Sequence, residues 1–194
     1  MIKVHTIVNT ILRSCTYILH NEDKYVYLID CGDIEPILSF IKINNKVIKG
    51  IFLTHCHYDH IYGINQITNM FPDTIIYASA ETIVGLKDSR INLSKYHGEP
   101  MILSEDAIAK EISKLSDIQI FNKKIIIIET PGHDTGCLSY LIGNMLFTGD
   151  SYIPNIPVFT KWKRSDKIVA TKTENRLKEF LKNNKLSLYS GHLI

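Results

Sequence analysis

The feature that most constrains this chain is a cluster of metal-binding side chains placed directly after a short apolar run. Residues 47–53 are mostly apolar, which predicts a buried strand. The segment His55-x-His57-x-Asp59-His60 follows at once. Imidazoles and carboxylates are good ligands for zinc and other borderline metals. Because neighbouring side chains of a loop can point to different sides, this segment predicts ligands for two adjacent metal ions, and the alternative is a histidine-rich polar surface.

Three further polar residues each follow a strand-like run. They are His133 in P-G-H, Asp150 in T-G-D and His192 in G-H. Taken alone, each is more typical of a turn, a helix N-cap or a chain end than of a metal ligand. Loops at strand ends are nevertheless where a rigid sheet commonly presents functional groups. The clusters together therefore predict one shared site at the edge of a sheet.

The pattern along the chain mixes strands with helices. Strands are predicted at residues 6–9, 16–20, 25–29, 47–53, 74–78, 118–121, 125–129, 138–142, 145–148 and 186–189. Helices are predicted at residues 34–43, 80–87 and 167–182. Asp33 is a candidate N-cap for the first helix, and residues 88–116 show no clear pattern. Strand pairs at both ends, with strand–helix units between them, favour a layered domain of mixed type.

Length and composition restrict the class of protein. The 194 residues favour a single domain over residues 1–194. A net charge of +2 is too small to indicate a nucleic-acid or acidic-membrane partner, and no apolar run approaches the ~20 residues that span a bilayer. The first residues lack a secretory signal pattern, and the cysteines form no CxxC pair. We therefore expect a cytoplasmic protein with free thiols.

The ordered motifs T-H-x-H-x-D-H, P-G-H, T-G-D and G-H resemble those of the metallo-β-lactamase superfamily over nearly the whole chain. The segment L-I-D-C-G around Asp30 resembles the first motif of that family, in which an aspartate supports the metal site from behind. The resemblance implies an α+β fold, a four-layer αββα sandwich with the metals at one edge. It implies His55, His57 and His133 on one metal, Asp59, His60 and His192 on the other, and Asp150 as the bridge.

The sequence departs from this family pattern at a few positions. Cys56 lies inside the first motif at a position that the family leaves free, and Cys137 stands where glyoxalase II enzymes often have histidine; both are interpreted as structural. Glyoxalase II proteins usually continue into a helical substrate-binding region, whereas this sequence stops two residues after His192. Tyr152 follows Asp150 closely and is a candidate substrate contact, with a packed aromatic ring as the alternative.

The function that the resemblance implies is metal-dependent hydrolysis. Zinc lowers the pKa of a bound water molecule to ~7, and a hydroxide between two zinc ions would attack a small ester, a thioester of the glyoxalase II type or a lactone. Asp59 would accept a proton, and Asp30 would orient a ligating histidine. We expect two zinc ions per chain, with iron or manganese as alternatives, and a small-molecule substrate.

Three other functions stay open. A mononuclear iron enzyme of the persulfide dioxygenase type shares several motifs, but residues 151–155 lack the G-C-G-R segment usual in those enzymes. A phosphodiesterase or nuclease is weakly indicated by the basic residues and tryptophan of 161–164, which could instead line the substrate entrance. A non-catalytic metal-binding module would be expected to lose a ligand. Neither a nucleic-acid nor a membrane partner is expected, and a homodimer remains open.

Overall fold

Two β-sheets form the centre of the chain in the computed structural model, which describes residues 1–98 and 100–193. The first sheet has the order β1-β2-β3-β4-β5-β6 and the second the order β11-β10-β9-β8-β7. The first sheet comprises β1 (Lys3–Val8), β2 (Cys15–His20), β3 (Tyr25–Ile29), β4 (Val47–Phe52), β5 (Ile75–Ala78) and β6 (Ile108–Glu111). The second comprises β7 (Ile118–Ile120), β8 (Lys123–Glu129), β9 (Leu138–Ile142), β10 (Met145–Gly149) and β11 (Ser187–Ser190).

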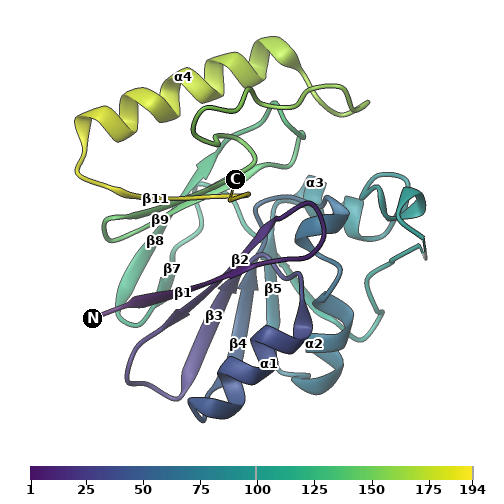
Figure 1. Cartoon of the computed structure of the whole chain (residues 1–194), viewed down its shortest axis with the longest axis vertical. Helices are drawn as coiled ribbons and strands as arrows, with labels where there is room; N and C mark the ends of the chain where they lie inside the picture. Colours follow the sequence, from purple (N-terminus) through teal and green to yellow (C-terminus); the bar gives the residue numbers. More distant parts are fainter. Residues whose placement is uncertain (99, 194) are drawn as a thin grey trace.

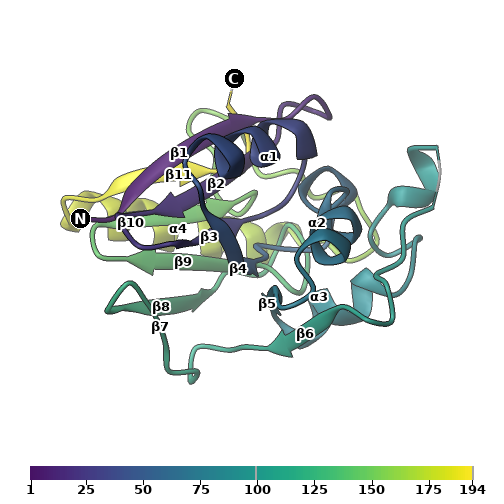
Figure 2. The same ribbon diagram turned by 90° about the horizontal axis from the view of Figure 1, so that it is seen from below.

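Helices cover the outer face of each sheet. They are α1 (Ile34–Ile43), α2 (Ile64–Met70), α3 (Ala80–Leu86) and α4 (Lys167–Asn183), with short 3-10 turns η1 (Tyr58–His60) and η2 (Ser94–Tyr96). Figure 1 shows α4 on one side of the two sheets and α1 and α2 on the other. Figure 2 confirms the order of layers, with α1 and α2 in front and α4 behind. The predicted αββα sandwich is therefore confirmed.

Alternation along the strands explains these layers, because successive side chains of a strand point to opposite faces of the sheet. In β2, Ile18 belongs to the buried cluster that includes Ile37 of α1 and Ile64 of α2. The next residue, Leu19, belongs to the cluster that includes Phe147 of the second sheet. Each such buried side chain contributes about 1.5–3 kcal/mol to stability. The first sheet is therefore held from both sides, by helices and by the second sheet.

The loop that carries His133 is anchored on α4. Gly132 has a φ of +133°, and a Cβ added there would lie 2.3 Å from the Cα of Ala170. The Thr173 hydroxyl also donates to the main-chain oxygen of Pro131 over 2.7 Å. Glycine is needed at position 132 for both its conformation and this close approach. The helix therefore fixes where His133 enters the site.

Parallel strand pairs bring distant parts of the sequence to one edge. β3 is parallel to β4, and β10 is parallel to β11. Parallel neighbours end at the same edge of a sheet, so the residues that follow them gather there. Asp30 and His55 come after the first pair, and Asp150 and His192 come after the second. The fold thus places the predicted site residues at one edge of the sandwich.

Three local features differ from the sequence expectations. Helix α2 and strand β6 were not predicted, because α2 has seven residues with mixed isoleucine, threonine and asparagine, and β6 is exposed along its length. Asp33 does precede α1, but its side chain does not cap the helix. It accepts hydrogen bonds from Thr10 and from the Tyr62 hydroxyl instead. Within the described residues, none of the helices combines the length and the apolar character needed to cross a membrane.

Candidate metal centre

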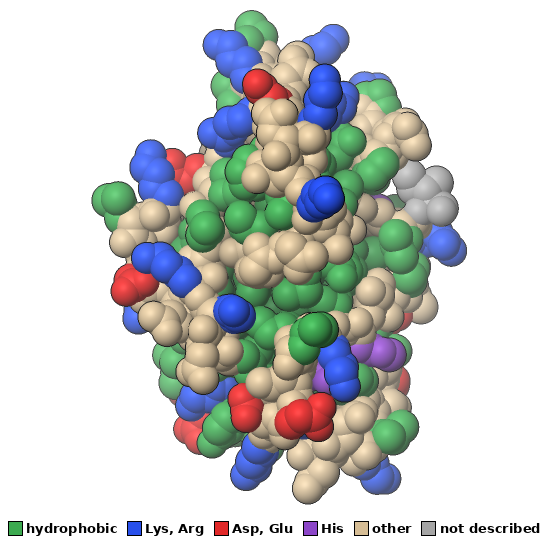
Figure 3. All heavy atoms as spheres, turned by 90° about the vertical axis from the view of Figure 1, so that its left-hand side faces the viewer, with side chains coloured by type: hydrophobic (Ala, Val, Ile, Leu, Met, Phe, Trp, Pro, Cys, Tyr) green, Lys and Arg blue, Asp and Glu red, His purple; other side chains and the backbone are tan. Residues whose placement is uncertain are grey.

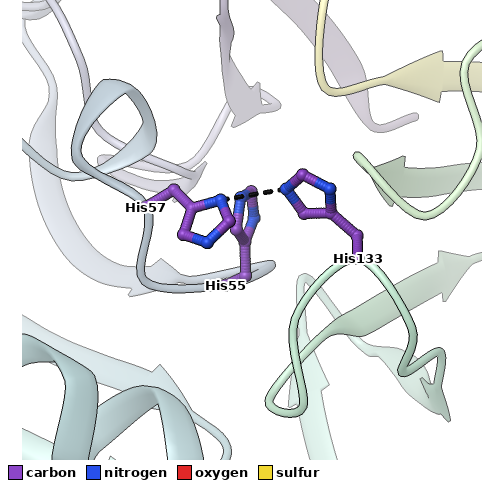
Figure 4. Close-up of side chains that lie close together, drawn as sticks. All are labelled: His55, His57 and His133. Carbon is purple, nitrogen blue, oxygen red and sulfur yellow. Dashed lines mark hydrogen bonds between the residues drawn. The ribbon is translucent and has the colours of Figure 1, made fainter. Parts of the chain in front are cut away.

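Three buried histidines form the first part of the site. His55 and His57 come from the loop after β4, and His133 comes from the loop between β8 and β9. One ring nitrogen from each lies within 4.8 Å of the others. Figure 4 shows the three rings pointing toward one another, and the dashed line joins His57 Nδ1 and His133 Nε2, which are 2.9 Å apart. These side chains are the ones that the sequence predicted for one metal ion.

A second group of three residues lies beside the first. It consists of Asp59, His60 and His192, whose ligand atoms also lie within 4.8 Å of one another. His60 Nε2 is 3.3 Å from Asp59 Oδ2 and 3.3 Å from His192 Nε2. His192 Nε2 is 3.4 Å from the same carboxylate oxygen of Asp59. The structure thus brings together the residues predicted for the other metal ion.

Asp150 lies between the two groups. One of its carboxylate oxygens, Oδ1, is 3.3 Å from His60 Nε2. The other, Oδ2, is 3.5 Å from His133 Nε2 and 3.2 Å from His192 Nε2. A single carboxylate therefore contacts nitrogens of both groups, which is the geometry expected of a bridging ligand.

A second layer of contacts orients the rings from behind. His60 Nδ1 donates to Asp30 over 2.9 Å, and Asp30 also accepts from the main chain and hydroxyl of Thr54. The Thr54 hydroxyl donates its single proton to Asp30, so its oxygen accepts the hydrogen bond from His55 Nδ1. Such contacts fix the tautomer of a ligating histidine and leave its other nitrogen free for a metal. Asp30 therefore lies where the sequence predicted a supporting aspartate.

Main-chain oxygens support two more rings. His133 Nδ1 donates to the carbonyl oxygen of Phe159, and His192 Nδ1 donates to that of Leu12, each over 2.9 Å. Sequence reasoning missed both contacts, because a carbonyl oxygen carries no residue-type signal. The segment that follows Asp150 and the turn between β1 and β2 are thereby tied to the site.

An ion pair that the sequence did not indicate lies behind His57. Asp134 is 1 % exposed, and its oxygens are each 3.0 Å from a guanidinium nitrogen of Arg164. His57 Nε2 lies 3.8 Å from Asp134 Oδ2, on the side of the ring away from His133. The only signal in the sequence was the position of Asp134 directly after His133. Arg164, thirty residues further on, could not have been paired with it from the sequence.

Burial and charge act in opposite ways on the members of the cluster. Burial lowers the pKa of His55 and of His57 well below the ordinary value, which keeps these rings neutral with a free lone pair. Burial also acts to lower the pKa of His60, but the carboxylates of Asp59, Asp150 and Asp30 outweigh it and raise that pKa. The neutral rings are therefore those of His55 and His57, whereas the surrounding carboxylates favour the protonated form of His60.

These residues fit metal ions. Two neutral imidazole nitrogens 2.9 Å apart can share one proton at most, whereas a cation satisfies both lone pairs. His55 Nε2 is fully buried and has no hydrogen-bond partner among the described residues, which is costly for a polar atom. Nitrogen and carboxylate donors in this mixture suit zinc and iron. The donor set thus matches the chemistry expected from the sequence.

The cysteines and Tyr152 lie outside the ligand set. Cys56 packs against α3, since a Cβ added at Gly85 would lie 2.4 Å from its sulfur, and burial raises the pKa of its thiol to about 12. The sulfur of Cys137 accepts from the main chain of Asp134. The Tyr152 ring lies beside the Lys178 ammonium of α4, 5.8 Å from it. The structure does not bring Tyr152 to the cluster, so the packed-ring alternative describes it better than substrate contact.

Comparison with known proteins agrees with this geometry. The sequence profile of the Metallo-beta-lactamase superfamily matches residues 10–192. A hydroxyacylglutathione hydrolase from Aliivibrio fischeri is 24% identical over 135 residues, which are 70% of this chain and 45% of that protein. The chain therefore spans about half the length of the curated relatives that it matches.

Solved structures share the fold. The B3 metallo-beta-lactamase BLEG-1 superposes with a TM-score of 0.88 at 23% identity, over 99% of this chain and 92% of the other. TTHA1623, solved in a di-iron-bound form, superposes with a TM-score of 0.79 at 18% identity, over 98% and 93%. The predicted kinship with metal-dependent hydrolases is confirmed at the level of the family, whose named relatives include a hydrolase and a β-lactamase. The chain belongs to the metallo-β-lactamase superfamily.

Proposed function

We propose that this chain is a dinuclear zinc hydrolase that cleaves a small ester, thioester or lactone. The observation that carries the proposal is the position of Asp150, whose carboxylate lies within 3.5 Å of nitrogens from both histidine groups. A bridging carboxylate is characteristic of two metals that share one site, and such metals typically sit about 3.5–4 Å apart. His55, His57 and His133 would hold one ion, and Asp59, His60 and His192 the other.

Different residues of the chain would have different roles in hydrolysis. Metal ions held at such a site lower the pKa of a bound water molecule and polarise a carbonyl oxygen. The Asp59 carboxylate faces the cluster through Oδ2 and is placed to accept the proton of the attacking water. Asp30 holds His60 in one orientation through its Nδ1. Burial of nearly the whole cluster excludes competing water from these contacts.

The space beside the cluster suits a small apolar group. A cleft of about 340 Å³ contains His133, Asp150 and His192 and is otherwise lined mainly by apolar residues such as Ile156 and Phe159. Small-molecule sites are typically concave, mostly apolar and supplied with a few polar groups. The similarity to a hydroxyacylglutathione hydrolase supports an acyl thioester as one candidate, and the di-iron form of TTHA1623 keeps iron as the second candidate metal.

We also propose a type of substrate, a cellular setting and an oligomeric state for the chain. A small-molecule substrate is favoured over nucleic acid, because Arg164, one of the basic residues of 161–164, is already paired with Asp134. The four buried free cysteines support a reducing, cytoplasmic setting. A homodimer is a further proposal, and Figure 3 shows apolar side chains gathered in the middle of one face, a type of surface that protein partners use.

The Asp59→Ala variant tests the proposed function. We expect it to lower kcat on the preferred substrate about a hundredfold, because a proton acceptor that is also a ligand is lost. The measurement is steady-state hydrolysis of acyl thioesters, lactones, a chromogenic cephalosporin and a phosphodiester by the zinc-loaded protein. Asp73→Ala, which removes an exposed carboxylate between α2 and β5 that belongs to neither group of candidate ligands, is the matched control and should keep full activity. Turnover of the phosphodiester alone, or an unchanged kcat in Asp59→Ala, would refute the proposal.

A further inference from the structure

A second cleft reaches the histidine cluster at His57. It has a volume of about 550 Å³ and includes His57, whereas the apolar cleft described above includes His133. Trp162 and Lys163 line it from the segment after Asp150, and Arg90 and Tyr96 line it from the segment after α3. Because His57 and His133 are in contact, the two clefts meet at the histidine cluster. We call this second space the basic cleft.

The charges of the basic cleft leave one cation without an ionic partner. Arg164 also lines it, but its guanidinium is already held by Asp134. Arg90 shares its charge with Asp88, whose carboxylate is 3.5 Å from Arg90 Nε. Lys163 is exposed and forms no ion pair within the described parts of the chain, 1–98 and 100–193. The net positive charge of the cleft therefore comes from Lys163, and Arg90 lines the same cleft.

Two neighbouring aromatic rings line the two clefts, one ring in each. Phe159 lines the apolar cleft and Trp162 lines the basic one, with their ring centroids 5.6 Å apart. The Trp162 side chain is 41% exposed, so part of its ring is available to a ligand. Aromatic rings beside a cation favour a ligand that carries an apolar or planar part next to an anionic group.

We infer that the basic cleft binds an anionic group of the substrate, a carboxylate or a phosphate that lies beyond the scissile carbonyl. Lys163 is the principal contact, Arg90 contributes to it, and Trp162 packs against the adjoining part of the molecule. The inference rests on the proposed function, and it narrows the substrate to an acyl ester or thioester that bears an anion on one side. A neutral substrate would offer no opposite charge to Lys163.

Binding can be measured without turnover, because Trp162 is the single tryptophan of the chain. The zinc-loaded protein is titrated with benzoate, with phenyl phosphate and with the neutral analogue benzamide, and the tryptophan fluorescence is followed. We expect Lys163→Ala to raise the half-saturation concentration of the anions about three- to fivefold, the size of one exposed charge contact, and to leave that of benzamide unchanged. The anion that is more affected identifies the preferred group.

Lys161→Ala is the matched control, since Lys161 is an exposed lysine of the same segment that does not line the cleft. It should not change any of the three titrations. Equal effects of Lys163→Ala and Lys161→Ala would overturn the inference, and so would anion binding that does not change the tryptophan fluorescence. Direct binding of the anion to the metals would also overturn the inference, because Lys163→Ala and Lys161→Ala would then leave the half-saturation concentration equally unchanged.

A kinetic experiment separates this inference from the proposed function. The thioacetates of 3-mercaptopropionate and of 3-mercaptopropionamide have the same scissile bond and differ in one charge. We expect the ratio of their kcat/KM values, charged over neutral, to fall about three- to fivefold in Lys163→Ala and to stay constant in Lys161→Ala. Absence of turnover on both compounds in the wild type contradicts the proposed function, and the fluorescence titrations then still decide the inference. A constant ratio in Lys163→Ala overturns the inference alone.

Discussion

Replacement of Gly191 by alanine is expected to lower the free energy of unfolding by about 3 kcal/mol and to reduce the metal content below one ion per chain. A Cβ at this position would lie 2.0 Å from Asp150 Oδ1 and 2.7 Å from the main chain of Gly149. Neither group can yield easily, because Asp150 is held between His60, His133 and His192. The methyl group must therefore displace the carboxylate that lies between the two histidine groups.

Thermal unfolding and metal analysis of the purified variant provide the measurement. A loss of about 3 kcal/mol corresponds to a fall in Tm of about 6–12 °C for a domain of this size. Gly143→Ala is the control, because its φ of +62° strains an alanine but no atom lies within 4 Å of the added Cβ. It should lose only about 1–2 kcal/mol and keep its metal. A Gly191→Ala protein with full metal content would show that Asp150 is not constrained as described.

Removal of the metals is expected to lower Tm by about 10 °C. Without a cation, His57 and His133 present nitrogens to each other at 2.9 Å, and the carboxylates of the buried Asp59 and the partly buried Asp150 lie in the same cluster without a metal to bind. A ligand present at a thousand times its Kd stabilises the folded state by about 4 kcal/mol, which is about 8–16 °C here. The measurement is thermal unfolding before and after exhaustive chelation, followed by addition of zinc.

The reversibility of this shift distinguishes metal binding from damage by the chelator. Zinc should restore Tm in the wild type and in the Lys161→Ala variant, whose exposed side chain belongs to neither group of candidate ligands. Zinc should restore a smaller part of the Tm in Asp59→Ala, because this variant has lost one ligand atom of the second group. An unchanged Tm after complete removal of metal would mean that the buried cluster is stable without ions, contrary to this account.

The predictable part of the site is the part that follows strands. The candidate ligand residues could be named from the sequence because their short motifs follow apolar segments and resemble those of a known family. The parallel pairing of β3 with β4 and of β10 with β11 brings those segments to one edge. The helices α1, α3 and α4 were also predicted within a residue or two, since their hydrophobic spacing is regular. Regular patterns and strand ends thus carried most of the information.

The unpredicted part depends on contacts between distant residues or on the main chain. Arg164 pairs with Asp134 only because the segment after Asp150 folds back over the loop of His133, where Ser165 also donates to a main-chain oxygen. Leu12 supports His192 through a carbonyl oxygen at a turn whose left-handed backbone is not evident from its residue types. The position of Tyr152 likewise followed from packing on α4 and not from its distance in sequence to Asp150.

The two clefts at the histidine cluster restrict the class of substrate. Residues of the cluster line both an apolar space that includes Phe159 and a basic space that includes Trp162 and Lys163. A hydrolase with this arrangement would place the scissile carbonyl at the metals and direct the two halves of the substrate to different sides. The substrate class inferred above follows from that division, provided that two metals are held at the cluster.

The number of zinc ions bound per chain decides whether the two groups of residues hold two metals. The purified protein is freed of metal, dialysed to equilibrium against zinc, and its zinc and protein contents are determined together. We expect two zinc ions per chain in the wild type and fewer than two in Asp150→Ala, which lacks the carboxylate between the two groups. One ion or none in the wild type, or two in Asp150→Ala, would contradict the proposed two-metal site.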